Sequence, residues 1–206
     1  MKNRILVAIL AVGFAVVLNA CNTTSTPLQD PQIDQNTTIQ QDQDAFIQQV
    51  DPFVRVDSGG RFGLDAQAVQ TLSAESLTRA NQYLEAVNAQ ISLGLLVANA
   101  DMSLSVPGAG LSTLANANGW KLYWWGFRLA LDATRTRKVI AALTVGAGTS
   151  ALISLIPFPP TAVGGKIVAA LLGIGAGALS YCNAAGHGVY IYRNWLGTSW
   201  CRSQPS

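Results

Sequence analysis

The sequences VIAALTVGAGTSALISLI at 139–156 and AVGGKIVAALLGIGAGALSYC at 162–182 form two long apolar runs. Pro157-Phe158-Pro159-Pro160 separates them, and proline neither continues a helix nor favours helix in the residue before it. The two runs therefore predict a hairpin of two apolar helices within 139–182, around which we expect the rest of the chain to fold.

Small residues recur at every fourth position in both runs, which places them on one face of each predicted helix. Such a face lets two helix backbones approach closely. The residues predicted to pack the two helices together are Ala142, Gly146 and Ser150 of the first run and Ala169, Gly173 and Gly177 of the second.

The first 20 residues have the parts of a secretory signal peptide: two basic residues, an apolar stretch and a small residue before the cut. The end of this segment, Leu18-Asn19-Ala20-Cys21, resembles the lipobox of bacterial lipoproteins. That resemblance implies cleavage before Cys21, a diacylglycerol on its thiol, and a place on the outer face of a bacterial membrane or cell envelope. Cleavage without lipid is the alternative, and a retained transmembrane anchor is less favoured because the apolar stretch is short for a span.

Residues 21–50 are rich in Gln, Asn, Thr and Asp and contain few large apolar side chains. Such a segment buries too little apolar surface to offset the loss of chain entropy. We therefore expect a disordered tether at 21–50, followed by one domain at 51–206.

The domain carries signals for both strands and helices. Two β-rich segments around a Gly-Gly turn predict a β-hairpin over Asp51–Leu64. Apolar spacings of three and four over Ala66–Asn99 predict an amphipathic helix in that segment, and Ser73 is a candidate cap for the helix proper. Period-two alternation predicts strands at Trp120–Leu131 and Val189–Arg193. The expected fold is α+β, with the central apolar helical hairpin covered by the amphipathic helix and a small, mostly antiparallel sheet.

With Cys21 lipidated, Cys182 and Cys201 are the remaining cysteines. Because an exported protein meets an oxidising environment, we expect these two to form a disulfide. The bridge would tie the C-terminal tail to the end of the second apolar run.

The order of the motifs resembles a group of small secreted bacterial proteins. The matching elements are Gly60-Arg61-Phe62-Gly63-Leu64-Asp65, Tyr123-Trp124-Trp125-Gly126-Phe127-Arg128-Leu129, an apolar helix pair and Gly186-His187-Gly188-Val189-Tyr190-Ile191. The resemblance spans Asp51 to about Trp200. It implies an order of elements and no established activity.

The charges are distributed unevenly along the chain. All 11 acidic residues lie at or before Asp132, and six basic residues with no acidic residue follow it. This asymmetry is compatible with contact to anionic lipid and equally with an ordinary solvated surface. The residues with a potential membrane contact are Trp124, Trp125, Arg135, Arg137 and Lys138. Six scattered cations form no basic stripe, so nucleic acid is not an expected partner.

The sequence contains no pattern typical of a catalytic, cofactor-binding or metal-binding site. The single histidine, His187, lies between two glycines and is interpreted as a turn residue. The glycines at 173–177 lie inside an apolar run without the preceding strand that dinucleotide binding requires, so helix packing is the better interpretation. We therefore predict neither an enzyme nor a cofactor.

Two functions remain open at this stage. The first is a non-enzymatic cell-envelope lipoprotein that binds or scaffolds, with membrane lipid as its partner through Cys21 and anionic lipid or an envelope protein as a further partner. The alternative is a membrane-active, bacteriocin-like protein that inserts the apolar hairpin into anionic bilayers. The aromatic residues on both sides of the hairpin fit a buried sheet, which we favour, or an interfacial belt.

Overall fold

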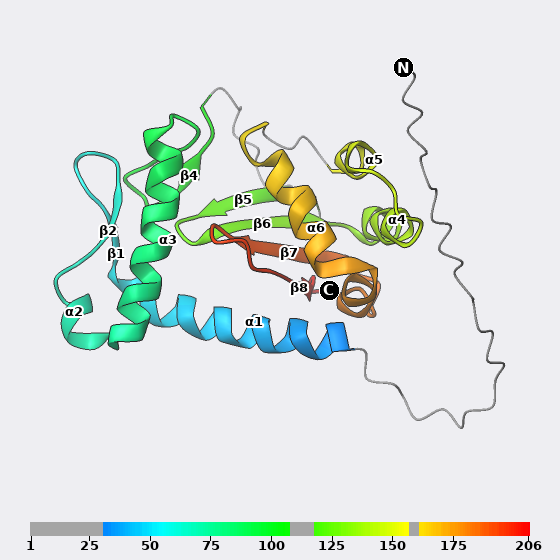
Figure 1. Cartoon of the computed structure of the whole chain (residues 1–206), viewed down its shortest axis with the longest axis horizontal. Helices are drawn as coiled ribbons and strands as arrows, with labels where there is room; N and C mark the ends of the chain where they lie inside the picture. Colours follow the sequence, from blue (N-terminus) through cyan, green and yellow to red (C-terminus); the bar gives the residue numbers. More distant parts are fainter. Residues whose placement is uncertain (1–30, 108–117, 157–160) are drawn as a thin grey trace, which may run out of the picture.

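Figure 1 shows the computed structural model of the chain, which describes residues 31–107, 118–156 and 161–206. The described residues form an α+β fold, as the sequence predicts. The helices are α1 (Pro31–Val50), the 3-10 helix η1 (Asp51–Phe53), α2 (Ala68–Thr71), α3 (Ala74–Ser92), α4 (Ala133–Thr144), α5 (Thr149–Ser154) and α6 (Thr161–Cys182). The strands are β1 (Val54–Val56), β2 (Phe62–Leu64), β3 (Val97–Ala98), β4 (Leu104–Ser105), β5 (Gly119–Tyr123), β6 (Gly126–Leu131), β7 (Val189–Asn194) and β8 (Ser199–Ser203).

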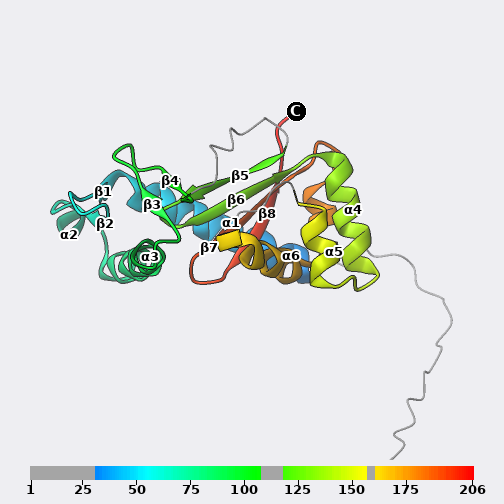
Figure 2. The same ribbon diagram turned by 90° about the horizontal axis from the view of Figure 1, so that it is seen from above.

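The largest sheet has the strand order β5-β6-β7-β8, and every neighbouring pair is antiparallel. The register aligns Leu129 with Ile191 and Ile191 with Cys201, so these three side chains share one face of the sheet. All three are fully buried. Helix α6 covers this apolar face (Figure 2).

The second apolar run is a helix, as predicted, and supplies the core under the sheet. Its buried apolar residues follow helical spacing and are Ile167, Val168, Ala170, Leu171, Ile174, Ala178, Leu179 and Cys182. Gly175 has φ 78° and ψ 168°, which interrupts the regular helix and marks a kink. Glycine is the residue that adopts this conformation without steric cost.

The first apolar run does not form the single helix that we predicted over Val139–Ile156. Helix α4 ends at Thr144 and α5 begins at Thr149. Gly146 has φ 69°, and the amide of Ala147 donates to the carbonyl of Ala142 at 2.8 Å. A left-handed glycine followed by this backward hydrogen bond is a common helix C-terminus, so Gly146 ends the helix there.

The predicted helix pair exists, but it is not the centre of the molecule. Helix α4 packs on α6, and Figures 1 and 2 place α4 and α5 at one end of the sheet. The residues predicted to turn the chain between the two runs, 157–160, lie outside the described residues. The core instead lies between α6 and the apolar face of the sheet.

The disordered tether predicted for 21–50 is wrong from Pro31 onward. Residues Pro31–Val50 form helix α1, which contacts α6 and β8 and runs along the β8 edge of the sheet (Figure 1). Its buried residues are Asn36, Gln43, Phe46 and Val50, which lie on one face of the helix. Half of this buried face is polar, so composition alone predicts disorder where a folded helix forms.

The segment between α1 and the sheet follows the predictions more closely. Strands β1 and β2 form the expected antiparallel hairpin. Helix α3 begins at Ala74, and the hydroxyl of Ser73 accepts a hydrogen bond from the amide of Ser76, which confirms the predicted cap. The single helix predicted over Ala66–Asn99 is divided into the short α2 and the longer α3, followed by β3.

The single strand predicted over Trp120–Leu131 is a hairpin of β5 and β6, with Trp124-Trp125 at its turn. Gly126 begins β6 opposite Asn194, and a Cβ at Gly126 would lie 2.1 Å from the carbonyl oxygen of Arg193. The glycine therefore allows β6 to approach β7 closely at this point. The alternation that we read as one strand is two strands folded on each other.

Candidate functional site

The face of the sheet opposite α6 carries aromatic and basic side chains in register. Lys121 pairs with Arg128, Arg128 with Tyr192, and Tyr192 with Trp200, which forms a row across all four strands. The neighbouring row pairs Tyr190 with Arg202. Because directly paired residues point to the same side, these side chains share one surface.

Five aromatic rings form a continuous array on this side of the sheet, which we call the aromatic face; Tyr123, Tyr190 and Tyr192 are half-buried, and Trp125 and Trp200 are buried. The rings of Tyr123 and Trp125 stack with centroids 4.8 Å apart, and those of Tyr192 and Trp200 stack at 5.3 Å. Trp125 joins the two stacks, since its centroid lies 5.8 Å from that of Trp200. Stacked geometry of this kind fixes the ring planes.

Each of three tyrosine rings of the aromatic face has a basic side chain beside it. The guanidinium of Arg128 lies 4.5 Å from the ring centroid of Tyr190, and that of Arg202 lies 5.7 Å from Tyr192. The ammonium of Lys121 lies 5.1 Å from the ring of Tyr123. These distances are those of cation–π contacts.

The cations differ in how far they are neutralised. Arg202 forms an ion pair with Asp44 of α1. Lys121 interacts at longer range with Asp101, whereas Arg128 has no carboxylate within ion-pair distance among the described residues. In that same part of the chain, Nε of Arg128 and Nε1 of Trp200 are buried without a hydrogen-bond partner. The aromatic face therefore carries a positive charge at Arg128 that no described carboxylate neutralises.

The environment of this face shifts the pKa of three groups. Burial raises the pKa of Tyr123 and of Tyr192 above the ordinary value of 10.0, so both hydroxyls stay protonated at neutral pH. Burial also raises the pKa of Asp44, and the charge of Arg202 opposes this shift. The face therefore combines neutral hydroxyls with fixed cations, which suits an anionic ligand with planar or apolar surfaces.

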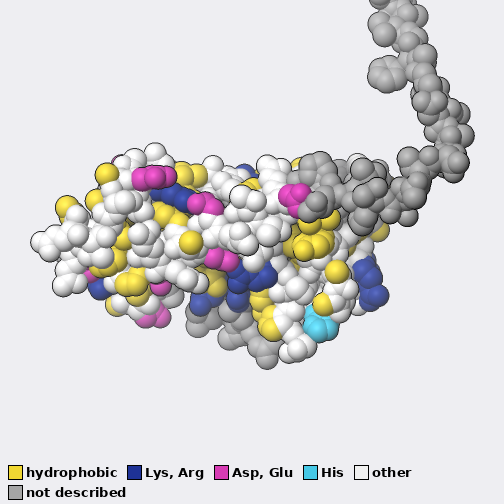
Figure 3. Space-filling view, turned by 90° about the horizontal axis from the view of Figure 1, so that it is seen from below, with side chains coloured by type: hydrophobic (Ala, Val, Ile, Leu, Met, Phe, Trp, Pro, Cys, Tyr) yellow, Lys and Arg dark blue, Asp and Glu magenta, His cyan; other side chains and the backbone are white. Residues whose placement is uncertain are grey.

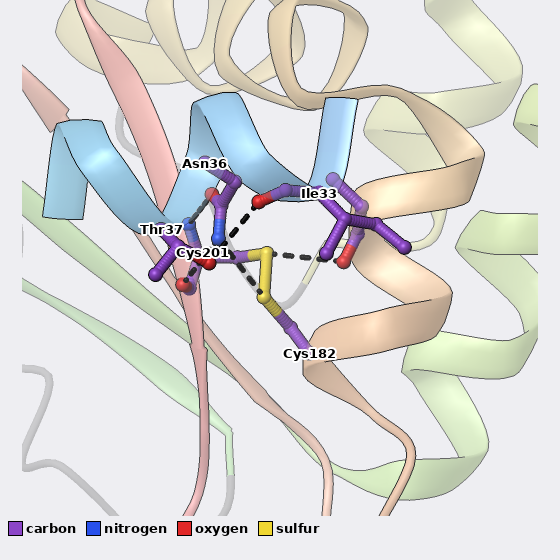
Figure 4. Close-up of a disulfide and its surroundings, with 6 residues drawn as sticks. Ile33, Asn36, Thr37, Cys182 and Cys201 are labelled. Atoms are coloured by element: carbon purple, nitrogen blue, oxygen red, sulfur yellow. Dashed lines mark hydrogen bonds between the residues drawn. A yellow bond between two sulfur atoms is a disulfide. The ribbon is translucent and has the colours of Figure 1, made fainter. Parts of the chain in front are cut away.

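The predicted disulfide between Cys182 and Cys201 is present, and it joins the end of α6 to β8 (Figure 4). Asn36 of α1 lies against it: its side-chain Nδ2 donates to the carbonyl of Cys201 at 3.2 Å, and its Oδ1 accepts from the amide of Cys201 at 2.9 Å. Both sulfur-bearing residues are buried. The position of the bridge indicates a structural role.

The small residues predicted to pack the two apolar helices do not lie between them as a set. Gly146 lies after the end of α4, and Ser150 is exposed on α5. Gly173 is exposed and faces Ser199 of β8, while Ala142, Ala169 and Gly177 are half-buried. Gly173 and Ala178 instead border a small cavity of about 70 Å³ that Asn36 and Ile39 line from α1.

The proposed membrane contacts are also partly wrong. Trp124 and Trp125 are 4% and 6% exposed, because both pack within the aromatic interior of the fold. Nε1 of Trp124 donates to Asp51 at 2.8 Å. Arg135 is half-buried near the start of α4, whereas Arg137 and Lys138 are exposed there. The buried tryptophans favour the interpretation of a sheet core over that of an interfacial belt.

Other predicted features give no site. Cys21 lies outside the described residues. His187 is exposed in the turn between α6 and β7. Among the described residues, no group of three or more His, Cys, Asp or Glu side chains is arranged to hold a metal ion.

Comparison with protein families, with curated proteins and with solved structures found no match to this chain. Within the described residues, one helical stretch, Gly164–Cys182, is long and apolar enough to cross a bilayer, and 44% of it is buried inside the protein. The core helix of a soluble domain has the same properties. Function must therefore be argued from the surfaces of this fold.

Sequence reasoning missed the aromatic face, although part of its signal was present. The alternation of Tyr190 and Tyr192 with Val189, Ile191 and Arg193 shows that one side of β7 is aromatic. The pairing of Lys121 with Arg128 depends on a hairpin turn at Trp124-Trp125 that the sequence reading did not contain. Without that turn, the row of cations and rings cannot be assembled.

Proposed function

We propose that the chain is an exported, non-enzymatic lipoprotein that binds an anionic polysaccharide of the cell envelope on its aromatic face. The lipobox-like sequence before Cys21 supports the export and the lipid anchor. The observation that carries the binding function is Arg128, a half-buried cation without an acidic partner among the described residues, set beside Tyr190 in the row with Lys121.

The composition of the aromatic face supports a sugar polymer with carboxylate or phosphate groups. The apolar face of a sugar ring stacks on aromatic rings, and Tyr123, Tyr190 and Tyr192 are the partly exposed rings of this face. Arginine binds carboxylate or phosphate through paired N–H donors. The cations follow one another across strands β5, β6 and β8. An extended polymer can therefore contact several of them at once, which raises its apparent affinity.

The binding function is tested with polygalacturonate as the anionic polymer and dextran as the neutral one, added to the purified mature chain. Tryptophan fluorescence and calorimetry should report binding of polygalacturonate that weakens as salt is raised. Dextran should bind much more weakly. Equal binding of both polymers would contradict the proposal.

Two arginines give a matched pair of variants. Arg128→Gln should weaken polygalacturonate binding by about tenfold, because it removes charge-assisted hydrogen bonds to the polymer. Arg193→Gln should have no effect, since Arg193 pairs with Phe127 on the opposite side of the sheet. If both variants lose affinity to the same degree, the aromatic face is not the binding surface.

The anchor is tested separately by mass spectrometry of the N-terminal peptide of the chain after secretion from a bacterial host. The proposal predicts a mature chain that begins at Cys21 and carries a diacylglyceryl group. Cys21→Ser should release the protein from the membrane fraction. A chain cleaved before Cys21 without lipid would contradict the anchor and leave the polysaccharide site to its own test.

A membrane-active function is the second candidate, and the apolar stretch Gly164–Cys182 is the observation that favours it. Insertion would require α6 to leave the sheet, although its apolar residues are buried there and the disulfide ties its end to β8. The oxidised protein should therefore release no dye from anionic vesicles. Dye release by the oxidised, folded protein would favour this candidate over the binding module.

A further inference from the structure

One end of the molecule carries α4, α5, the C-terminal end of α6 and the N-terminal end of α1 (Figures 1 and 2). We call it the α4 end, and its exposed basic and large apolar side chains are Arg137, Lys138, Val145, Ile153 and Tyr181. The opposite end carries α2 and the β1–β2 hairpin. The two ends differ in both charge and surface chemistry.

The outward surface of α4 is basic and apolar. Exposed residues recur at helical spacing and are Thr134, Arg137, Lys138, Ala141, Thr144 and Val145. Val145 is 79% exposed, and Ile153 of the adjacent α5 is 39% exposed. This surface contains no acidic residue, because none follows Asp132 in the sequence.

Among the described residues, two acidic residues lie at this end, Asp132 and Asp34, and each has a partner within the protein. The carboxylate of Asp132 accepts a hydrogen bond from the amide of Arg135 at 2.7 Å as the cap of α4. Asp34 lies in the first turn of α1, and it also has a partner within the protein. Figure 3 shows Lys and Arg side chains (dark blue) at the end of the molecule where α4 lies.

The position of Arg137 and Lys138 is not explained by the stability of α4. Both lie in the second turn of the helix, where the helix dipole gives cations no stabilisation. Neither forms an ion pair with a described carboxylate. Their position is explained if an anionic surface outside the protein contacts them.

The start of α1 places the predicted anchor near this surface. Pro31 begins α1 at the α4 end, and nine residues, or ten Cα–Cα steps, separate it from Cys21. Ten steps reach at most about 36 Å. A lipid on Cys21 therefore keeps the start of α1, and with it the α4 end, within about 36 Å of the bilayer.

We infer that the α4 end is a lipid-contacting surface that lies on an anionic bilayer through Arg137 and Lys138, with Val145 and Ile153 at the headgroup boundary. One lipid chain binds reversibly, and a basic patch is a common second signal for stable attachment. This contact orients the domain, so that the aromatic face stands beside the bilayer and remains accessible. The inference takes only the anchor at Cys21 from the proposed function.

The test uses the mature chain from Cys21 to Ser206, which retains every described residue. Its Cys21 thiol is coupled to a maleimide lipid, because Cys182 and Cys201 are paired and do not react. The protein is attached to vesicles that contain phosphatidylglycerol or only phosphatidylcholine, and amide hydrogen exchange is measured on both. This tether replaces natural lipidation, so the result does not depend on the anchor or on polysaccharide binding.

On phosphatidylglycerol vesicles, amides of Ala133–Ser154 should exchange several-fold more slowly than on phosphatidylcholine vesicles, with no change in Ala68–Ser92. Each basic residue near an anionic surface strengthens the contact about fivefold. The double variant Arg137→Glu, Lys138→Glu should therefore abolish the difference between the two lipids. Arg61→Glu, at an exposed position far from α4, should leave it unchanged.

Untethered protein gives an independent measurement, because the double variant should also co-sediment less with phosphatidylglycerol vesicles at low salt. Equal exchange of Ala133–Ser154 on both lipids would overturn the inference. Protection that appears at Ala68–Ser92 instead would also overturn it. A double variant that keeps the protection of the original chain would overturn it as well, because the inference assigns the contact to Arg137 and Lys138.

Discussion

Helix α1 and the apolar run Val139–Ile156 pack in the opposite way to what their compositions predict. The polar segment Pro31–Val50 is a folded helix against the disulfide and the edge of the sheet. The apolar run is two short helices at one end of the molecule, with Val145 and Ile153 exposed. Composition limits how much apolar surface a segment can bury. The elements that pack against the segment determine which of its residues are buried.

The partner of α1 is the edge of β8, beside which the described part of the chain places no further strand. An unpaired edge exposes backbone donors and acceptors that attract other strands. Asn36 supplies both a donor and an acceptor to Cys201. In the amide orientation that satisfies its neighbours, Gln40 donates to the same carbonyl and accepts from Nε of Arg202, each at 3.2 Å. Amide side chains thus take the place of a fifth strand.

Helix α1 also joins the sheet to α3. Gln43 accepts hydrogen bonds from Tyr83 at 3.0 Å and from Asn194 at 3.3 Å, and all three residues are buried. Arg79 forms two hydrogen bonds with Asp42, at 3.1 and 2.7 Å, and lies over the ring of Phe46. Polar residues at helical spacing therefore connect elements that do not follow one another in the chain.

The largest effect on stability should come from removing the disulfide that joins β8 to the end of α6. The double variant Cys182→Ser, Cys201→Ser should lower the free energy of unfolding by about 3 kcal/mol, because the unfolded chain gains entropy. Urea unfolding followed by circular dichroism measures the change. An unchanged stability would mean that the bridge does not constrain the fold.

Asn36→Ala should cost about 2 kcal/mol, because the amide and carbonyl of Cys201 lose their partners in a buried site. Gln35→Ala is the control, since Gln35 is exposed one position earlier in α1. The same unfolding assay compares the two variants. Equal and small effects would show that α1 does not pair with the sheet edge.

Two glycine variants should change stability in opposite directions. Gly146→Ala should destabilise the protein by about 1 kcal/mol, because alanine is strained at φ 69°. Gly173→Ala should stabilise it by up to about 1 kcal/mol, since the position is helical and the new Cβ makes ordinary contacts with Ser199. If Gly146→Ala were stabilising, the first apolar run would be one continuous helix as its composition predicts.

The smallest effect concerns pH. The hydrogen bond from Arg79 lowers the pKa of Asp42 below 3.8, although burial opposes the shift. A lowered pKa in the folded state gives stability that is present above pH 3.8 and is lost as the pH falls through the folded value. The loss should stay below about 1 kcal/mol, because the pair is partly solvated. Asp42→Asn should remove this part of the acid dependence of unfolding.

The sequence predicts those features whose signals are local. Ser73 caps α3, the segments around Gly59-Gly60 pair as a hairpin, and β7 alternates as a strand, because each depends on residues a few positions apart. The pairing of the two cysteines follows from their number and the expected compartment. These features need no knowledge of the distant parts of the chain.

The remaining features depend on contacts between distant residues. Asn36 and Cys201 are 165 positions apart, and nothing near Asn36 indicates that a sheet edge will meet it. The aromatic face likewise requires the register that aligns Lys121 with Arg128 and Tyr192. For this reason the sequence predicts a tether where Pro31–Val50 forms a helix. It likewise predicts one strand where Trp120–Leu131 contains the β5–β6 hairpin.

Amide hydrogen exchange of the purified protein tests the reversed roles of the two regions most directly. The account predicts that amides in Asn36–Val50 of α1 exchange slowly, close to those of α6, while amides in 145–151 exchange much faster. Rapid exchange throughout α1, together with uniform protection across Val139–Ile156, would contradict it.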